Sequence, residues 1–189
     1  MIVSVEGFKG VGKTTLIAGL KAEFPHFLCT TGEQKLQCLK MNPLKEGDAE
    51  SNFYFTRRIL VAYFSDIWER RTPGQTIIFD RGPEELEYFT LHYPRQLGCD
   101  WNVEKNLNRE LDVLRRMKSD LIVFLDVEEE VLSQRRRSAA KKRSGDAGTD
   151  LLNSKHMRSF FERLPCVRFL DTSSLNPCAV VDAVKIWIR

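Results

Sequence analysis

Short apolar segments alternate along this chain with longer stretches in which apolar residues recur every three or four positions. The short segments predict five β-strands, at Ile2–Glu6, Phe27–Thr31, Thr76–Asp80, Leu121–Val127 and Val167–Asp171. Two of these strands are apolar at every position within Ile77–Phe79 and Leu121–Leu125, as expected of strands buried on both faces. Because strands alternate with helical stretches, the pattern predicts an α/β fold with a five-stranded parallel sheet and helices on both faces.

Helical periodicity is clearest in three of the longer stretches. One stripe, ended by Pro73 and Gly74, consists of Leu60, Tyr63, Phe64, Ile67 and Trp68. A narrower stripe before the fourth strand consists of Leu107, Leu111 and Leu114. The last helix is predicted to begin at Pro177 behind the capping residue Asn176, with a buried face of Val180, Val181, Val184, Trp187 and Ile188. We expect all three stripes to pack into the core.

Composition narrows the class of protein. The 189 residues are 42% hydrophobic and 29% charged, which predicts one globular domain spanning residues 1–189. No stretch approaches the roughly 18 consecutive apolar residues of a membrane helix, and the first residues lack the basic segment of a secretory signal. The five cysteines are scattered and never form C-x-x-C, which argues against a disulfide framework and a zinc site. A cytoplasmic protein without membrane association is expected.

Positive charge is concentrated in one segment. Six of the 29 Lys and Arg residues lie within Arg135–Arg143, without an intervening acid, whereas the rest of the chain has 23 basic against 26 acidic residues. Such a local excess indicates a local anionic partner.

The strongest motif follows the first predicted strand. Gly7-Phe-Lys-Gly-Val-Gly-Lys-Thr14 fits the P-loop pattern G-x-x-x-x-G-K-[ST] and precedes an amphipathic stretch that Pro25 ends. The glycines let backbone N–H groups surround phosphate oxygens, while Lys13 reaches the β- and γ-phosphates and Thr14 holds Mg²⁺. The residues expected to bind the nucleotide are Gly7, Lys9, Gly10, Val11, Gly12, Lys13, Thr14 and Thr15.

A P-loop alone does not identify the reaction, because GTPases, ATPases and kinases all contain one. The GTPase strings D-x-x-G and N-K-x-D and the transporter string L-S-G-G-Q do not occur in this chain. Asp80 and Arg81 do occur at the end of the third strand, where α/β sheets bind their ligands. An acid there organises Mg²⁺, and the neighbouring cation meets a phosphate.

These features resemble the thymidylate kinase and deoxynucleoside kinase group of P-loop kinases along most of the chain. The pair Asp80-Arg81 matches the group's Asp-Arg or Glu-Arg pair, and Leu125-Asp-Val127 matches the end of its fourth strand. Within Phe53–Arg58, Arg58 matches the arginine that contacts substrate phosphate better than Arg57 does. Arg135 lies nine residues after Asp126, the spacing of the arginine at the start of the group's lid segment.

The resemblance implies ATP- and Mg²⁺-dependent phosphoryl transfer to a nucleotide, with a nucleoside monophosphate as acceptor. The catalytic residues it implies are Lys13, Asp80, Arg81, Arg135 and Glu33, with Mg²⁺ on Thr14 and Asp80. Arg58, Arg81 and Glu33 are expected to bind the acceptor. A mobile basic lid is expected at about residues 135–150, because an arginine on a closing segment stabilises the charge that moves during transfer.

Several alternatives stay open at this stage. The basic segment Arg135–Arg143 also fits a solvated helix face. Nucleic-acid binding is disfavoured, because no aromatic residue lies between these Lys and Arg residues to stack on a nucleobase. The chain departs from the group at Ala139, where a second lid arginine is expected, and around Glu33, Glu85, Phe89 and Thr90, so the base specificity is open. The acceptor could instead be a nucleoside 5′-hydroxyl, with Glu33 as the base. A second alternative is a regulatory protein that binds nucleotide without turnover. A homodimer is also open.

Overall fold

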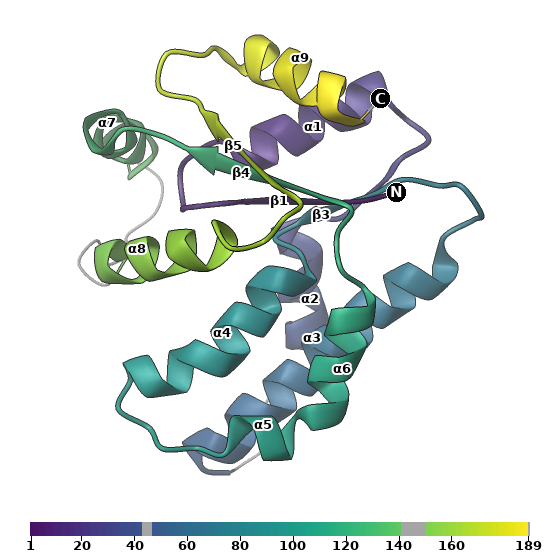
Figure 1. Ribbon diagram of the computed structural model, residues 1–189, viewed down its shortest axis with the longest axis vertical. Coiled ribbons are helices and arrows are strands. Elements are labelled where there is room, and N and C mark those ends of the chain that lie inside the picture. Colours follow the sequence, from purple (N-terminus) through teal and green to yellow (C-terminus); the bar gives the residue numbers. More distant parts are fainter. Residues whose placement is uncertain (43–46, 141–149, 189) are drawn as a thin grey trace.

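A computed structural model describes residues 1–42, 47–140 and 150–188. Its centre is a parallel sheet of five strands in the order β2-β3-β1-β4-β5 (Figure 1). The strands are β1 (Ile2–Gly7), β2 (Leu28–Cys29), β3 (Ile77–Asp80), β4 (Leu121–Asp126) and β5 (Val167–Asp171). Each predicted strand is confirmed, although β2 is shorter than predicted because it pairs with β3 only through its two residues.

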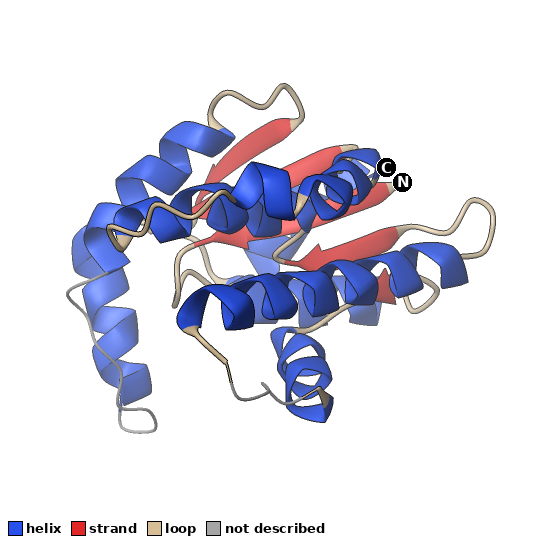
Figure 2. Ribbon diagram, turned by 90° about the horizontal axis from the view of Figure 1, so that it is seen from below, coloured by secondary structure: helices blue, strands red, loops and turns tan. Residues whose placement is uncertain are grey.

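Helices cover both faces of the sheet (Figure 2), which confirms the predicted layers. Helices α1 (Lys13–Glu23) and α9 (Pro177–Ile188) cover one face. The other face carries α3 (Ala49–Arg70), α4 (Pro83–Gln96), α6 (Asn108–Arg116) and α8 (Asp150–Phe161). The remaining elements are α2 (Gly32–Met41), α5 (Val103–Asn106) and α7 (Glu129–Ala140).

The predicted stripes form much of the core. On the α1 and α9 side, Val180, Val181 and Val184 pack against the apolar residues of β1 and β4. On the opposite face, Phe64 of α3 meets Phe79 of β3 edge to face, with 5.0 Å between the ring centroids. Burial of these aliphatic and aromatic side chains on both faces is the main stabilisation of the sheet.

Local signals set the ends of two helices, and the sequence predicts all of them except the Asp48 cap. The N–H of Ala179 donates to Oδ1 of Asn176 at 2.9 Å, so Asn176 caps α9 and Pro177 takes its first position. Helix α3 ends before Pro73 and Gly74 and begins behind Asp48, whose Oδ1 accepts the N–H of Ser51 at 2.7 Å. The Asp48 cap thus fixes where the 22-residue helix α3 starts.

The carboxyl ends of β1 and β3 lie next to each other, because Val5 pairs with Asp80. The P-loop leaves β1 at Gly7, which has φ +126, and a Cβ at this position would collide with the carbonyl oxygen of Leu125. Glycine is therefore required where the loop turns off the sheet. Parallel strands thus bring the P-loop and the Asp80-Arg81 pair to one edge.

The predicted lid is partly outside the described residues. Its beginning, from Arg135, is the last part of α7, and residues 141–149 are not described. Within the described ranges, the helices all lack the combination of length and apolar character that a membrane crossing requires.

Candidate functional site

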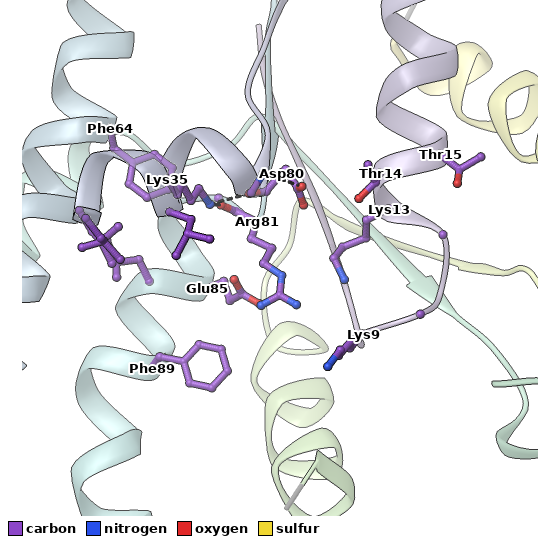
Figure 3. Close-up of a pocket in the computed structure, with 18 of the residues that line it drawn as sticks. Lys9, Lys13, Thr14, Thr15, Lys35, Phe64, Asp80, Arg81, Glu85 and Phe89 are labelled. Atoms are coloured by element: carbon purple, nitrogen blue, oxygen red, sulfur yellow. Dashed lines mark hydrogen bonds and ion pairs between the residues drawn. The ribbon is translucent and has the colours of Figure 1, made fainter. Parts of the chain in front are cut away.

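A cavity of about 720 Å³ opens at the carboxyl ends of β1 and β3 (Figure 3). One side is the P-loop, and the other side is formed by α2, α3 and α4. The P-loop residues that line it are Lys9, Gly10, Gly12, Lys13, Thr14 and Thr15. Val11 instead points into the core, where it is 1% exposed. The structure therefore brings most of the predicted nucleotide-binding residues to one cavity.

The P-loop has the backbone that its glycines predict. Gly10 and Gly12 have φ +96 and +110, the left-handed region that glycine adopts without strain, and α1 starts directly after Gly12. The ammonium of Lys13 donates to the carbonyl oxygens of Gly7 at 2.6 Å and Phe8 at 2.9 Å. Burial lowers the pKa of Lys13 to about 8, and the nearby Arg81 adds to the decrease. This lysine is thus held at the loop within the cavity.

Thr14 and Asp80 face one another across the cavity and present hard oxygen atoms. Oδ2 of Asp80 accepts the N–H of Gly32 at 3.0 Å, which orients the carboxylate. A hydroxyl and a carboxylate fit Mg²⁺, which takes one or two protein ligands beside phosphates and takes water for the rest. Among the described residues no cluster of three or more His, Cys, Asp or Glu side chains could hold a metal ion.

Arg81 extends from the end of β3 into the cavity (Figure 3). Its guanidinium lies 3.6 Å from a carboxylate oxygen of Glu85, one turn along α4. Glu85 and Phe89, two positions that the sequence left open for base reading, also line the cavity. Thr90, the third, is 2% exposed and donates to the carbonyl of Leu86 at 2.6 Å, so it belongs to α4 rather than to the cavity.

The structure places two neighbouring arginines differently with respect to the cavity. Arg58 lies outside the cavity, where its guanidinium contacts Glu110 at 3.1 Å and the carbonyl of Asn106 at 3.2 Å. Arg57 lines the cavity and lies 4.6 Å from the ring centroid of Phe53. Burial lowers the pKa of Arg57 to about 10, and its Nε has no hydrogen-bond partner among the described residues. Arg57, and not Arg58, is therefore the arginine of this pair that lines the cavity.

Glu33 does not reach this cavity in the structure. It lies exposed in the first turn of α2, beside a reciprocal cap in which Thr31 and Gln34 bond each other's backbone N–H groups. Its expected role as a base stays a prediction. The carboxylates that do line the cavity are Asp80 and Glu85.

Arg135 reaches the P-loop from outside the cavity. Its guanidinium donates to the carbonyl of Thr172 at 2.6 Å and to the carbonyl of Val11 at 3.4 Å. The next residue, Arg136, donates to the carbonyl of Lys9 at 3.0 Å. Helix α7 is thus attached to the P-loop, although Arg135 is not among the residues that line the cavity. The expected role of Arg135 in transfer stays a prediction.

Sequence reasoning missed the α2 wall of the cavity. Gly32, Lys35, Leu36 and Leu39 line it. Their spacing of i, i+3, i+4 and i+7 is that of one helix face, a signal present in the sequence. Leu36 remains 52% exposed because it faces the cavity rather than the core.

Comparison with known proteins supports the fold. The structure is similar to a thymidylate kinase from Candida albicans, with 22% identity, a TM-score of 0.58, and coverage of 99% of this chain and 90% of that one. It is similar to a deoxyadenosine kinase from M. mycoides solved with dCMP and dCDP, with 15% identity, a TM-score of 0.66, and coverage of 100% and 98%. A thymidylate kinase from Ehrlichia chaffeensis has 14% identity, a TM-score of 0.61, and coverage of 100% and 98%.

No protein-family model matches the sequence, and no curated protein sequence does. The structural similarity nevertheless spans nearly the whole length of each chain. At these identities it shows a shared fold, and the predicted P-loop kinase fold is confirmed.

Proposed function

Because the chain has the fold of thymidylate and deoxyadenosine kinases, we propose that it transfers a phosphoryl group from ATP to a nucleoside monophosphate, with Mg²⁺. One observation carries this proposal: a single cavity joins the P-loop to the Asp80-Arg81 pair and to a compartment between α2, α3 and α4. A donor site that opens directly into a second compartment suits transfer between two small molecules. A nucleotide-binding regulatory protein has no need of the second compartment.

The P-loop supplies the donor side of the proposed reaction. Its backbone N–H groups and Lys13 would hold the ATP phosphates, and Lys13 would exchange the carbonyls of Gly7 and Phe8 for phosphate oxygens. Thr14 and Asp80 would hold Mg²⁺, which supplies charge neutralisation for the transferring group. Holding reactants in line supplies most of the rate enhancement in this class of reaction.

Cations on the acceptor side favour a monophosphate. Lys35, Arg57 and Arg81 line the cavity, and among the described residues the carboxylates that line it are Asp80 and Glu85. A monophosphate is already anionic at neutral pH, so an enzyme that phosphorylates it needs positive charge more than a general base. The apolar wall formed by Leu36, Leu39 and Leu60 offers a surface for the flat face of a base.

Arg135 is proposed to act during transfer from α7. It lies beside the P-loop through Val11, and its bonds to Thr172 are with neutral oxygens that an anionic phosphoryl group can displace. A guanidinium delivered in this way stabilises the transition state more than the ground state.

A nucleoside 5′-hydroxyl is the second candidate acceptor, favoured by the carboxylate of Glu85 inside the cavity. A hydroxyl must lose its proton during transfer, so a carboxylate base is needed in that case. Glu33→Gln and Glu85→Gln distinguish the two candidates. A nearly inactive Glu33→Gln or Glu85→Gln variant would identify that glutamate as a base and would favour the nucleoside.

The proposal is tested with a panel of nucleosides and nucleoside monophosphates, scored by ADP release from Mg·ATP. We expect release that depends on a monophosphate and stops in excess EDTA. Release only with nucleosides would establish the second candidate. If the protein binds ATP and releases no ADP with any member of the panel, it is not a kinase of these acceptors.

A further inference from the structure

The segment that joins β3 to α4 has an unusual backbone. In this Asp80–Gly82 turn, Arg81 has φ +63, the only positive φ of a non-glycine residue in the described part of the chain. Left-handed backbone is unfavourable for an arginine and persists only where neighbouring contacts hold it. The turn places the Asp80 carboxylate and the Arg81 guanidinium in the same cavity. The contacts that hold this conformation therefore affect the site.

The backbone N–H groups of the turn are held by the sheet beneath. That of Asp80 donates to Oγ1 of Thr30 at 3.0 Å, and that of Arg81 donates to the carbonyl of Val5 at 3.1 Å. That of Gly82 donates to Oε1 of the buried Glu6 at 2.6 Å. All three partners come from β1 or from the residue that follows β2, so they fix the turn on its inner side.

One side chain holds the carbonyl groups on the outer side. The ammonium of Lys35 donates to the carbonyl of Asp80 at 2.5 Å and also to the carbonyl of Arg81 (Figure 3). The same ammonium lies 4.8 Å from the ring centroid of Phe64. Lys35 therefore binds both carbonyls that flank the left-handed residue, from a different element of the fold.

The surroundings of Lys35 favour a fixed position. Burial lowers the pKa of Lys35, whereas the carboxylates of Glu85, Glu6 and Asp80 favour its charged form. A charged ammonium that has lost water needs other oxygen acceptors, and the two carbonyls supply them. Breaking these hydrogen bonds would therefore take two acceptors from the Lys35 ammonium and this donor from the carbonyls of Asp80 and Arg81.

We propose that Lys35 is a positioning residue whose ammonium holds the Asp80–Gly82 turn in its left-handed conformation and so sets the geometry of Asp80 and Arg81. This inference rests on the proposed function for its effect on catalysis, whereas its effect on the turn does not. Loss of the ammonium leaves two carbonyls without their donor, and the turn relaxes toward ordinary backbone angles. Small displacements of a positioned group near the reacting atoms lower the rate by up to roughly a hundredfold.

The test uses Lys35→Met, which keeps an unbranched apolar side chain and removes the donor. Lys35→Gln is the second variant, since its amide retains a donor and supports the fold if Lys35→Met does not. The matched control is Lys40→Met, an exposed lysine of the same helix. Amide hydrogen exchange by NMR is measured at Arg81 and Gly82, and at Val123 of β4 as an internal reference.

We expect exchange at Arg81 and Gly82 to become at least tenfold faster in Lys35→Met and to stay unchanged at Val123 and in Lys40→Met. With the acceptor found by the ADP-release panel, kcat should fall at least tenfold while KM for ATP changes less than twofold, because the ammonium of Lys35 bonds to the Asp80–Gly82 turn. In Lys35→Gln, the exchange rates at Arg81 and Gly82 and the kcat should lie between those of the wild type and those of Lys35→Met.

Unchanged exchange in the turn overturns the proposal, whatever happens to activity. Faster exchange with an unchanged kcat overturns the catalytic part of it. If the wild-type protein transfers no phosphoryl group, the proposed function fails, and the exchange measurement still decides whether Lys35 holds the turn.

Discussion

The N–H of Gly32 donates to Oδ2 of Asp80 at 3.0 Å, which joins the first turn of α2 to the end of β3. The partial positive charge of a helix N-terminus stabilises a carboxylate in this place. Oδ2 is turned toward α2, so the other oxygen of Asp80 is the one available for a ligand. This relationship makes Asp80 the best test of the proposed metal site.

Asp80→Asn should raise the Mg²⁺ concentration needed for half-maximal activity by an order of magnitude or more, because an amide oxygen binds the ion less well than a carboxylate. A Mg²⁺ titration of ADP release measures the change. Asp66→Asn, on the exposed surface of α3, is the control. An unchanged titration would remove Asp80 from the metal site.

Lys13→Ala should lower kcat by a factor of 10² or more while the protein stays folded, because an ammonium that neutralises transferring phosphate contributes of order 3 kcal/mol to the transition state. Lys21→Ala on the exposed side of α1 serves as control. ADP release and thermal unfolding are measured together. Wild-type turnover by the Lys13 variant would exclude the P-loop assignment.

Arg57→Ala should raise KM for the acceptor about tenfold or more, the size expected for a lost charge-assisted contact of roughly 1.5–3 kcal/mol. Arg58→Ala is the matched control from the same helix turn, and we expect a change of less than twofold, since Arg58 contacts Glu110 instead. Steady-state kinetics with varied acceptor measures both. The reverse order of effects would restore Arg58 as the acceptor-binding arginine.

Arg135→Ala should lower kcat much more than it weakens ATP binding, because a cation that approaches the moving phosphoryl group acts chiefly on the transition state. The comparison is between kcat and the Kd of ATP from equilibrium titration. If only KM changes, Arg135 acts in ground-state binding through its contact with the P-loop.

Glu6→Gln should stabilise the protein near neutral pH. Burial raises the pKa of Glu6 well above its ordinary value of 4.5, and its Oε2 has no hydrogen-bond partner among the described residues. The folded protein therefore holds this proton more tightly than the unfolded chain, and the wild-type free energy of unfolding falls as pH rises from 4.5 to the raised pKa.

The glutamine variant lacks this decrease, so its advantage over the wild type should grow with pH over the same range. Urea unfolding at several pH values measures the difference. An advantage that does not change with pH would show that Glu6 has the same pKa in both states.

The sequence by itself determined the sheet and the phosphate-binding loop. The β3 and β4 segments are apolar at successive positions, a pattern that indicates strands buried on both faces of a sheet. The P-loop is specified by glycines whose left-handed backbone other residues adopt only at a cost, so the motif predicts its own conformation. Both signals are local, which is why they are readable without the fold.

Only the tertiary structure decided which polar side chains face the cavity. Arg57 and Arg58 are adjacent in sequence and about 100° apart around α3. Arg58 pairs with Glu110 of α6, which is 52 residues further along the chain. Lys35 meets the turn 45 residues further along the chain, and Arg135 meets Val11 at a separation of 124 residues. Contacts over such separations depend on how helices pack on the sheet, and that packing is set by the whole core rather than by any local pattern.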